Sequence, residues 1–138
     1  MERKSVAQEY YVLAVNKAGN MPAMNINELN AGLIVAEVID LSAEKVISVE
    51  KKKIAVIKEL PGELSHLAPL YDYLGEKPRS TDKLMGDYAM SGKKMRELTA
   101  SIGESLAAAG LADKEEGGLF GGKTVYIPKK AYKDELVD

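Results

Sequence analysis

The chain has 138 residues, a formal net charge of −2 and a hydrophobic content of 46%, and these values indicate one packed globular domain, 1–138. It contains no cysteine and a single histidine, so disulfides, thiolate catalysis and cysteine- or histidine-rich metal sites are excluded, and we expect no cofactor. No apolar run reaches the roughly 18 residues that a membrane span needs, and residues 1–11 lack an apolar signal core, so we expect a cytoplasmic protein.

Two helices are predicted in the N-terminal part of the chain. Apolar residues recur at helical spacing over 5–17 and again over 26–41. Asn25 or Asn27 can cap the second helix, because a short polar side chain accepts a hydrogen bond from a free N–H group. Gly32 lies in the middle of that helix, where glycine costs about 1 kcal/mol relative to alanine. A glycine at such a position indicates close packing against a neighbouring helix.

The middle of the chain predicts a hairpin followed by a helix. Residues 45–50 and 54–58 alternate apolar and polar side chains around three lysines, which is typical of a short hairpin. A Pro-Gly pair then breaks the chain. Residues 63–74 have the pattern of a helix that Pro69 can kink. His66 lies on this helix, and we expect it at the surface or half-buried.

Two further helices are predicted after this segment. Ser80 or Thr81 can cap a helix over 81–90. Residues 93–109 carry the longest helical pattern of the chain, and Gly110 ends it. The apolar face of this long helix is formed by Met95, Leu98, Ile102, Leu106 and Ala109.

A second hairpin and a last helix are predicted at the C-terminal end. The strands are expected over 118–120 and 123–127, joined by a Gly-Gly turn, and this register pairs Phe120 with Lys123. The last helix begins near residue 129. Its pattern continues to the last residue, so we expect a single domain that is truncated at its C-terminus.

The segment GGLFGGKT, residues 117–124, fits the phosphate-binding loop pattern G-x-x-x-x-G-K-[ST]. That pattern binds a nucleotide only when a helix opens at the Lys-Thr pair, because the free N–H groups of the helix hold the phosphate. Here Lys123 and Thr124 open a β-branched and aromatic run that Pro128 ends, which predicts a strand. The preceding residues 113–116 are mostly acidic. A glycine hairpin is therefore favoured over a nucleotide site, and no other motif indicates an enzyme.

Together the elements predict a mainly α fold: a compact helical domain with a short central hairpin and a projecting, winged-helix-like C-terminal β-hairpin. A DNA-binding winged helix needs basic residues on its recognition helix and wing. Residues 97–117 hold five acidic residues and one basic residue, which argues against nucleic acid as a partner. Residues 77–96 hold six basic and two acidic residues, and such a patch beside an apolar hairpin tip predicts an anionic-lipid site. The basic residues are Lys77, Arg79, Lys83, Lys93, Lys94 and Arg96.

Two roles remain open for the apolar residues of the second hairpin. Leu119 and Phe120 lie near its tip, where they can enter a membrane interface. Alternatively, Phe120 lies on the same face as Val125 and Ile127 and belongs to the core. A dimer formed through the hairpin is a further alternative.

Four landmarks follow one another along the chain over roughly 5–130. They are an opening helix (SVAQEYYVLAVNKAGNM), a glycine-containing second helix (LNAGLIVAEVIDL), a hairpin and Pro-Gly segment leading to KPRSTDKL, and a long helix with a hairpin (RELTASIGESLAAAGL, then GLFGGKTVYIP). In their order and spacing they resemble the Golgi phosphoprotein 3 family, the cytosolic phosphatidylinositol 4-phosphate-binding proteins of Golgi membranes, and its prokaryotic relatives. The resemblance implies a mostly helical, non-enzymatic protein.

The resemblance also implies a head-group site near the start of the second helix and on the long helix, where the family uses a tryptophan and arginines. This chain has no tryptophan. Asn30 and Thr99 stand where two of the family's arginines are matched, and Arg96 matches another. Arg96, with Lys93 and Lys94 near it, is expected to hold an anionic head group, because arginine offers a bidentate fork to phosphate.

The resulting hypothesis is peripheral binding of an anionic phospholipid or phosphoinositide head group by a cytoplasmic protein at a membrane surface. By the same resemblance, the hairpin residues Leu119, Phe120 and Lys123 are expected to contact the membrane or to form a homo-oligomer. No catalytic residue and no metal ligand is assigned. The alternative is a winged-helix-like DNA-binding or protein-interaction module.

Overall fold

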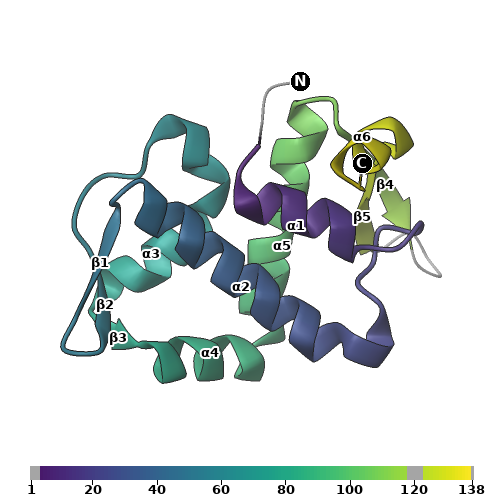
Figure 1. The fold of residues 1–138 in the computed structure, drawn as a ribbon. Helices are drawn as coiled ribbons and strands as arrows, with labels where there is room; N and C mark the ends of the chain where they lie inside the picture. Colours follow the sequence, from purple (N-terminus) through teal and green to yellow (C-terminus); the bar gives the residue numbers. More distant parts are fainter. Residues whose placement is uncertain (1–3, 118–122, 138) are drawn as a thin grey trace.

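The computed structural model describes residues 4–117 and 123–137, and in this part of the chain the fold is mainly α-helical (Figure 1). The α-helices are α1 (Val6–Ala14), α2 (Ile26–Ala43), α3 (Ala68–Glu76), α4 (Thr81–Met90), α5 (Gly92–Ala108) and α6 (Lys130–Val137). Short 3₁₀ helices, η1 (Ala23–Asn25) and η2 (Gly62–Leu67), precede α2 and α3. The strands are β1 (Ile47–Glu50), β2 (Lys53–Val56), β3 (Arg79–Ser80), β4 (Ala112–Gly117) and β5 (Lys123–Pro128). The predicted mainly α fold with a central and a C-terminal hairpin is confirmed.

Helix α1 begins where side chains take up its free N–H groups. The Ser5 hydroxyl accepts the Gln8 N–H at 3.2 Å and the Gln8 side chain accepts the Ser5 N–H at 3.0 Å, which forms a capping box. The carboxylate of Asp40 in α2 accepts the N–H groups of Val6 and Ala7, each at 2.9 Å. These bonds tie the start of α1 to the last turns of α2.

Helices α1 and α2 also pack closely at Gly32, as predicted. A Cβ atom at Gly32 would lie 2.1 Å from the hydroxyl oxygen of Tyr10. The glycine leaves room for the Tyr10 side chain, whose hydroxyl donates to the carbonyl of Leu29 at 3.0 Å. Asn25 occupies the N-cap position of α2, but its side chain makes no capping hydrogen bond.

The central hairpin belongs to a larger sheet than predicted. β1 pairs with β2 through a two-residue turn at Lys51 and Lys52, whose φ angles of 52° and 66° suit such a turn. β3 pairs with the other side of β2 and completes an antiparallel sheet in the order β1-β2-β3. The helix predicted over 63–74 is two helices, η2 and α3. Pro69 lies in the first turn of α3, where its missing N–H has no partner to lose.

Helix α5 is the central element of the core, because it contacts η2, α1, α3, α4, β4 and β5. Its predicted apolar face is buried at Met95, Leu98, Ile102 and Leu106. Ala109 is exposed, contrary to the prediction. It is the C-cap residue of the helix, and Gly110 then turns the chain away with a φ angle of 76°.

The C-terminal hairpin has a register different from the predicted one. β4 pairs with β5 from Ala112 opposite Pro128 to Gly117 opposite Lys123. The predicted pairing of Phe120 with Lys123 is therefore wrong. Figure 1 shows this hairpin at the opposite end of the molecule from the β1-β2-β3 sheet.

Burial of the second strand accounts for this register. The Tyr126 side chain of β5 is buried against α5, and a Cβ atom at Gly103 would lie 2.3 Å from a carbon of its ring. The register must keep this ring on the helix side of the hairpin, because a shift of one residue would turn it to the other face. The first strand, β4, is consequently formed around the charged and mostly acidic residues 113–116. The predicted strand 118–120, with Leu119, Phe120 and the Gly-Gly turn, lies outside the described residues.

Candidate functional site: a pocket between the long helix and the C-terminal hairpin

A pocket of about 550 Å³ lies where the α1–α2 connection, the first turns of α5 and strand β5 meet. In Figure 1 these elements lie on the side of the molecule that carries the C-terminal hairpin. Six apolar side chains from these elements form much of the wall: Val15, Met21, Ile26, Met95, Ala100 and Val125. Such a wall suits an organic ligand whose orientation is fixed by a few polar groups.

Arg96 is the charged residue among those described residues that line the pocket. It lies on the first turns of α5, whose start is capped by the Ser91 hydroxyl accepting the Lys94 N–H at 3.2 Å. Its guanidinium folds over Gly92, and one of its terminal nitrogens lies 3.1 Å from the place of a Cβ atom at that glycine. Within residues 4–117 and 123–137, the guanidinium has no ion pair and no hydrogen bond. No described residue therefore competes with an anion for this guanidinium.

Neutral polar groups surround this arginine. Tyr11 in α1 is 4% exposed, and its hydroxyl has no hydrogen-bond partner in the described part of the chain. Burial raises the pKa of Tyr11 to about 12, so the hydroxyl keeps its proton and can donate. The amide of Asn30 in α2 and the hydroxyl of Thr124 in β5 also line the pocket. The Thr99 hydroxyl shares its one proton between the carbonyls of Met95 and Arg96, each 3.1 Å away, so its oxygen can still accept.

The hairpin side of the pocket is held by contacts outside it. Tyr126 lines the pocket and donates its hydroxyl proton to the Glu104 carboxylate at 2.8 Å. Lys114 of β4 donates to the same carboxylate at 2.5 Å. The bond from Lys114, and then the bond from Tyr126, lower the pKa of Glu104. Burial, and then the bond to Glu104, raise the pKa of Tyr126 to about 12.

The structure brings two of the predicted head-group residues together. Arg96 and Asn30 both line the pocket, whereas Lys93 and Lys94 do not. The Lys93 side chain is 81% exposed and lies 3.8 Å from the Glu97 carboxylate. The Lys94 ammonium lies 5.1 Å from the centre of the Tyr73 ring, on a different side of α5. Of the predicted hairpin residues, Lys123 starts β5, and the side chains of Leu119, Phe120 and Lys123 lie outside the described part.

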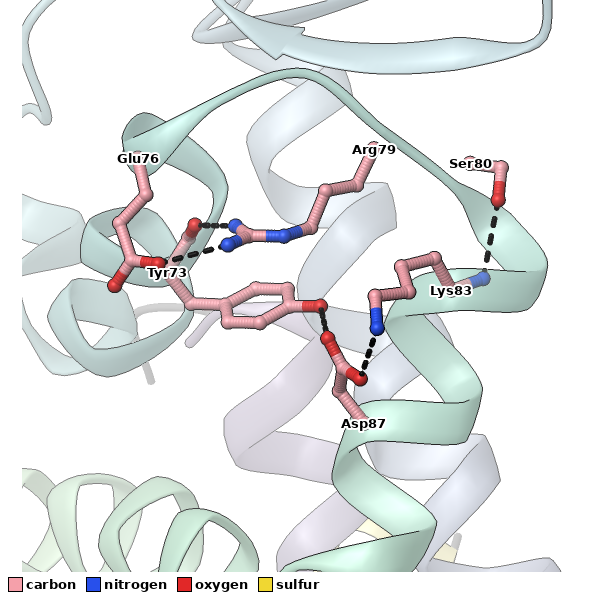
Figure 2. A network of polar contacts seen from close by, with 6 residues as sticks. All are labelled: Tyr73, Glu76, Arg79, Ser80, Lys83 and Asp87. Atoms are coloured by element: carbon pink, nitrogen blue, oxygen red, sulfur yellow. Dashed lines mark hydrogen bonds and ion pairs between the residues drawn. The ribbon is translucent and has the colours of Figure 1, made fainter.

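The predicted basic patch over 77–96 is divided by the structure, because Arg79 is buried. Figure 2 shows its guanidinium lying along the ring of Tyr73, with 3.9 Å between the guanidinium carbon and the ring centre. One terminal nitrogen of Arg79 donates to the Tyr73 carbonyl, and the other donates to Glu76 at 2.7 Å. Arg79 is only 8% exposed, so it stabilises the turn between α3 and α4 and offers little surface to a ligand.

Lys83, another cation of the predicted patch, is paired with a carboxylate. In Figure 2 the ammonium of Lys83 lies 3.0 Å from the carboxylate of Asp87. The same carboxylate accepts the Tyr73 hydroxyl proton at 2.5 Å. The bond from Tyr73, and then the bond from Lys83, lower the pKa of Asp87. The paired charges of Lys83 and Arg79 leave Arg96 as the basic residue of this segment that lines the pocket.

A Ser-His pair that the sequence did not predict lies at the start of α1. The Ser5 hydroxyl and the Nε2 atom of His66 are 2.8 Å apart, and His66 is buried, contrary to the prediction. The Ser5 hydroxyl also caps α1, and Asp40 accepts the next two N–H groups of that helix. The N–H groups of residues 5–9 are all taken up by these bonds and by the helix, and the Ser5–His66 contact joins the start of α1 to η2.

The described residues show neither a cluster of ligating side chains for a metal ion nor a helix long and apolar enough to span a membrane. The fold is a small helical domain, and among its described residues the pocket is lined by one arginine and otherwise by uncharged residues. Residues 6–137 match the model of the Golgi phosphoprotein 3 (GPP34) family. The chain belongs to this family, and the resemblance of the four landmarks is thereby confirmed. No curated protein matches the chain.

Proposed function

We propose that this protein binds the phosphate of an anionic lipid head group through Arg96 and thereby attaches to a membrane surface. The observation that carries the proposal is the guanidinium in a pocket of about 550 Å³, without a partner among the described residues. A guanidinium fits two phosphate oxygens with two parallel hydrogen bonds. The apolar wall around it suits the glycerol and first acyl carbons of a lipid. Under this proposal the protein binds its ligand and does not transform it.

Membership of the Golgi phosphoprotein 3 family supports the proposal, because the resemblance implies lipid binding in this region of the fold. Arg96 and Asn30, matched to the family's head-group residues, line one pocket although they lie on different helices. The charge of the neighbouring strand disfavours the alternative, duplex DNA. Asp113, Glu115 and Glu116 are exposed on β4 and would repel a phosphate backbone.

The proposal is tested by co-sedimentation with vesicles of neutral lipid alone and of neutral lipid mixed with an anionic phospholipid. We expect binding to the anionic vesicles and a loss of affinity of at least about tenfold in Arg96→Ala, because a hydrogen-bonded charge pair contributes about 1.5–3 kcal/mol. Lys93→Ala is the matched control, since it removes the same charge one turn away and outside the pocket. It should cause at most a small, salt-sensitive loss.

Two results would contradict the proposal. Equal losses in Arg96→Ala and Lys93→Ala would indicate attraction to general surface charge without a pocket. An absence of binding to every anionic vesicle, with the protein folded by circular dichroism, would overturn lipid binding. A gel-shift experiment with duplex DNA run in parallel should show no complex. A salt-sensitive shift there would favour the DNA-binding alternative.

A further inference from the structure

The two most exposed large apolar side chains in the described part of the chain are methionines, Met24 and Met90. Met24 is 98% exposed and Met90 is 89% exposed, whereas the next of these side chains, Val137, is 69% exposed. Single apolar side chains scattered over a surface are ordinary, but apolar side chains gathered at one place mark an interaction site. The place of the two methionines in the fold is therefore informative.

Both methionines lie next to residues that line the pocket of Arg96. Met24 is in η1, two residues before the lining residue Ile26, and Met90 is the last residue of α4, two residues before the lining residue Gly92. Figure 1 shows the start of α2 and the end of α4 on the lower side of the molecule. Two segments far apart in the sequence thus bring an almost fully exposed methionine to the neighbourhood of the same pocket.

The charges near the methionines suit an anionic surface. Arg96 is exposed and has no ion pair or hydrogen bond among the described residues. Lys93 and Glu97 lie 3.8 Å apart on the same helix and balance each other. The exposed Glu28 is two residues after Ile26, and a rotation of about 100° per residue turns it to the other side of α2. A cation without a described partner therefore lies beside exposed apolar side chains.

A membrane surface matches this combination of groups. Phosphates of the head groups bind the cation, and apolar side chains next to it enter the boundary between head groups and acyl chains. Methionine suits such a boundary, because its unbranched side chain adapts to irregular surroundings. Resting on the proposed function, we propose that Met24 and Met90 insert into an anionic membrane beside the head group that Arg96 holds. This contact is distinct from the hairpin contact that the resemblance implies.

The absence of tryptophan from the chain allows a direct test. Met24→Trp and Met90→Trp each introduce a single indole, and Val49→Trp is the control, because Val49 is an exposed residue of β1, in the sheet at the opposite end of the molecule from the C-terminal hairpin. Fluorescence is recorded with neutral vesicles and with vesicles that contain phosphatidylglycerol, with and without bromine atoms on the acyl chains. With the anionic vesicles we expect a blue shift and quenching by brominated chains in the two methionine variants, and neither in the control.

Removal of the two apolar side chains should weaken binding and change its dependence on salt. The double variant Met24→Gln and Met90→Gln keeps the side-chain length, and its affinity for the anionic vesicles should fall about tenfold or more. Its remaining binding should be more sensitive to salt than that of the wild type, because salt screens charge attraction between exposed groups and does not screen apolar burial. Val49→Gln is the matched control and should leave the affinity unchanged. Circular dichroism confirms that the variants are folded.

Four outcomes would contradict these expectations. Binding to the anionic vesicles without a blue shift or quenching in either methionine variant would overturn this inference and leave the proposed function standing. Equal quenching in Val49→Trp would also overturn it, because no particular side of the protein would then face the membrane. A changed oligomeric state of the double variant in sedimentation velocity, with unchanged vesicle affinity, would assign the methionines to a contact between copies of the chain and overturn it. No binding of the wild type to any anionic vesicle would overturn the proposed function itself.

Discussion

Glu37 of α2 should make the protein less stable as the pH rises, although carboxylates usually have the opposite effect. The side chain is 0% exposed, and neither of its carboxylate oxygens has a hydrogen-bond partner in the described part of the chain. Burial, and then the charge of Asp40 one turn away, raise the pKa of Glu37 well above its ordinary value. The folded protein therefore holds a proton on Glu37 that the unfolded chain releases.

The sign and size of the effect follow from this difference. Below the ordinary pKa of 4.5 both states carry the proton, and Glu37 adds no pH dependence. Above it the unfolded chain ionises first, so the free energy of unfolding falls by about 1.4 kcal/mol per pH unit until the raised pKa is reached. A neutral residue at this position has no such slope. Glu37→Gln should therefore gain stability relative to the wild type by about 1.4 kcal/mol for each pH unit above about pH 5.

Urea unfolding at a series of pH values between about pH 5 and about pH 8 measures the difference between the two proteins. Contributions from all other groups cancel in this difference. Glu28→Gln is the control, because Glu28 is an exposed glutamate on the same helix. Parallel curves for the wild type and Glu37→Gln would refute the reasoning. They would mean that the carboxyl of Glu37 ionises in the folded protein as it does in the unfolded chain.

Three further predictions concern other contacts. Gly103→Ala places a Cβ atom 2.3 Å from a ring carbon of Tyr126 and should lower the free energy of unfolding by about 1–3 kcal/mol. Gly86→Ala is its control: a Cβ atom there meets nothing within 4 Å, and the variant should raise the free energy of unfolding by up to about 1 kcal/mol. Equal shifts in the midpoint of thermal unfolding would contradict this prediction. Burial lowers the pKa of His66, so on acidification the unfolded chain takes up the proton before the folded protein does. The contribution of His66 to the free energy of unfolding should therefore decrease as the pH is lowered below 6.5. His66→Asn should remove this pH dependence, and an unchanged dependence in the same pH series would exclude His66 as its source. Arg79→Lys should lower the free energy of unfolding in urea by about 1–3 kcal/mol, because the buried carbonyl of Tyr73 and the exposed carboxylate of Glu76 lose a planar donor. A change within about 0.5 kcal/mol would show that lysine replaces it.

The helices could be predicted from the sequence because each buries one face against the core. The apolar spacing of α5 corresponds to its buried residues, and the Gly32 prediction holds because Tyr10 packs against that glycine. The strand β4 could not be predicted in the same way. Its residues 113–116 are charged and exposed, so alternation of apolar and polar residues is absent. Its pairing is decided by the burial of its neighbour β5, which local sequence does not express.

Helix geometry explains why only some of the residues predicted for the head-group site line one pocket. Successive residues of an α-helix are rotated by about 100°. Lys94 is two residues before Arg96 and points to the opposite side of α5, where it meets Tyr73. Lys93 remains exposed beside Glu97. Helix rotation therefore separates Lys94 from Arg96, whereas Lys93 lies one turn from Arg96 but outside the pocket. Tyr11 was missed because nothing local distinguishes a tyrosine that lines a pocket from one that fills the core.

The pocket exists because the C-terminal hairpin packs against α5. Variants that disturb this packing should therefore behave differently from variants that change only a residue lining the pocket. Gly103 gives the Tyr126 ring its place against the helix, and Glu104 binds both Tyr126 and Lys114. These contacts lie behind the wall of the pocket, so a larger residue at position 103 should lower stability and ligand affinity together. Asn30 lines the pocket and has no hydrogen-bonded partner for its side chain among the described residues. A change there should alter affinity while the free energy of unfolding stays nearly constant, and this difference between the two positions would separate the binding groups from the contacts that hold them.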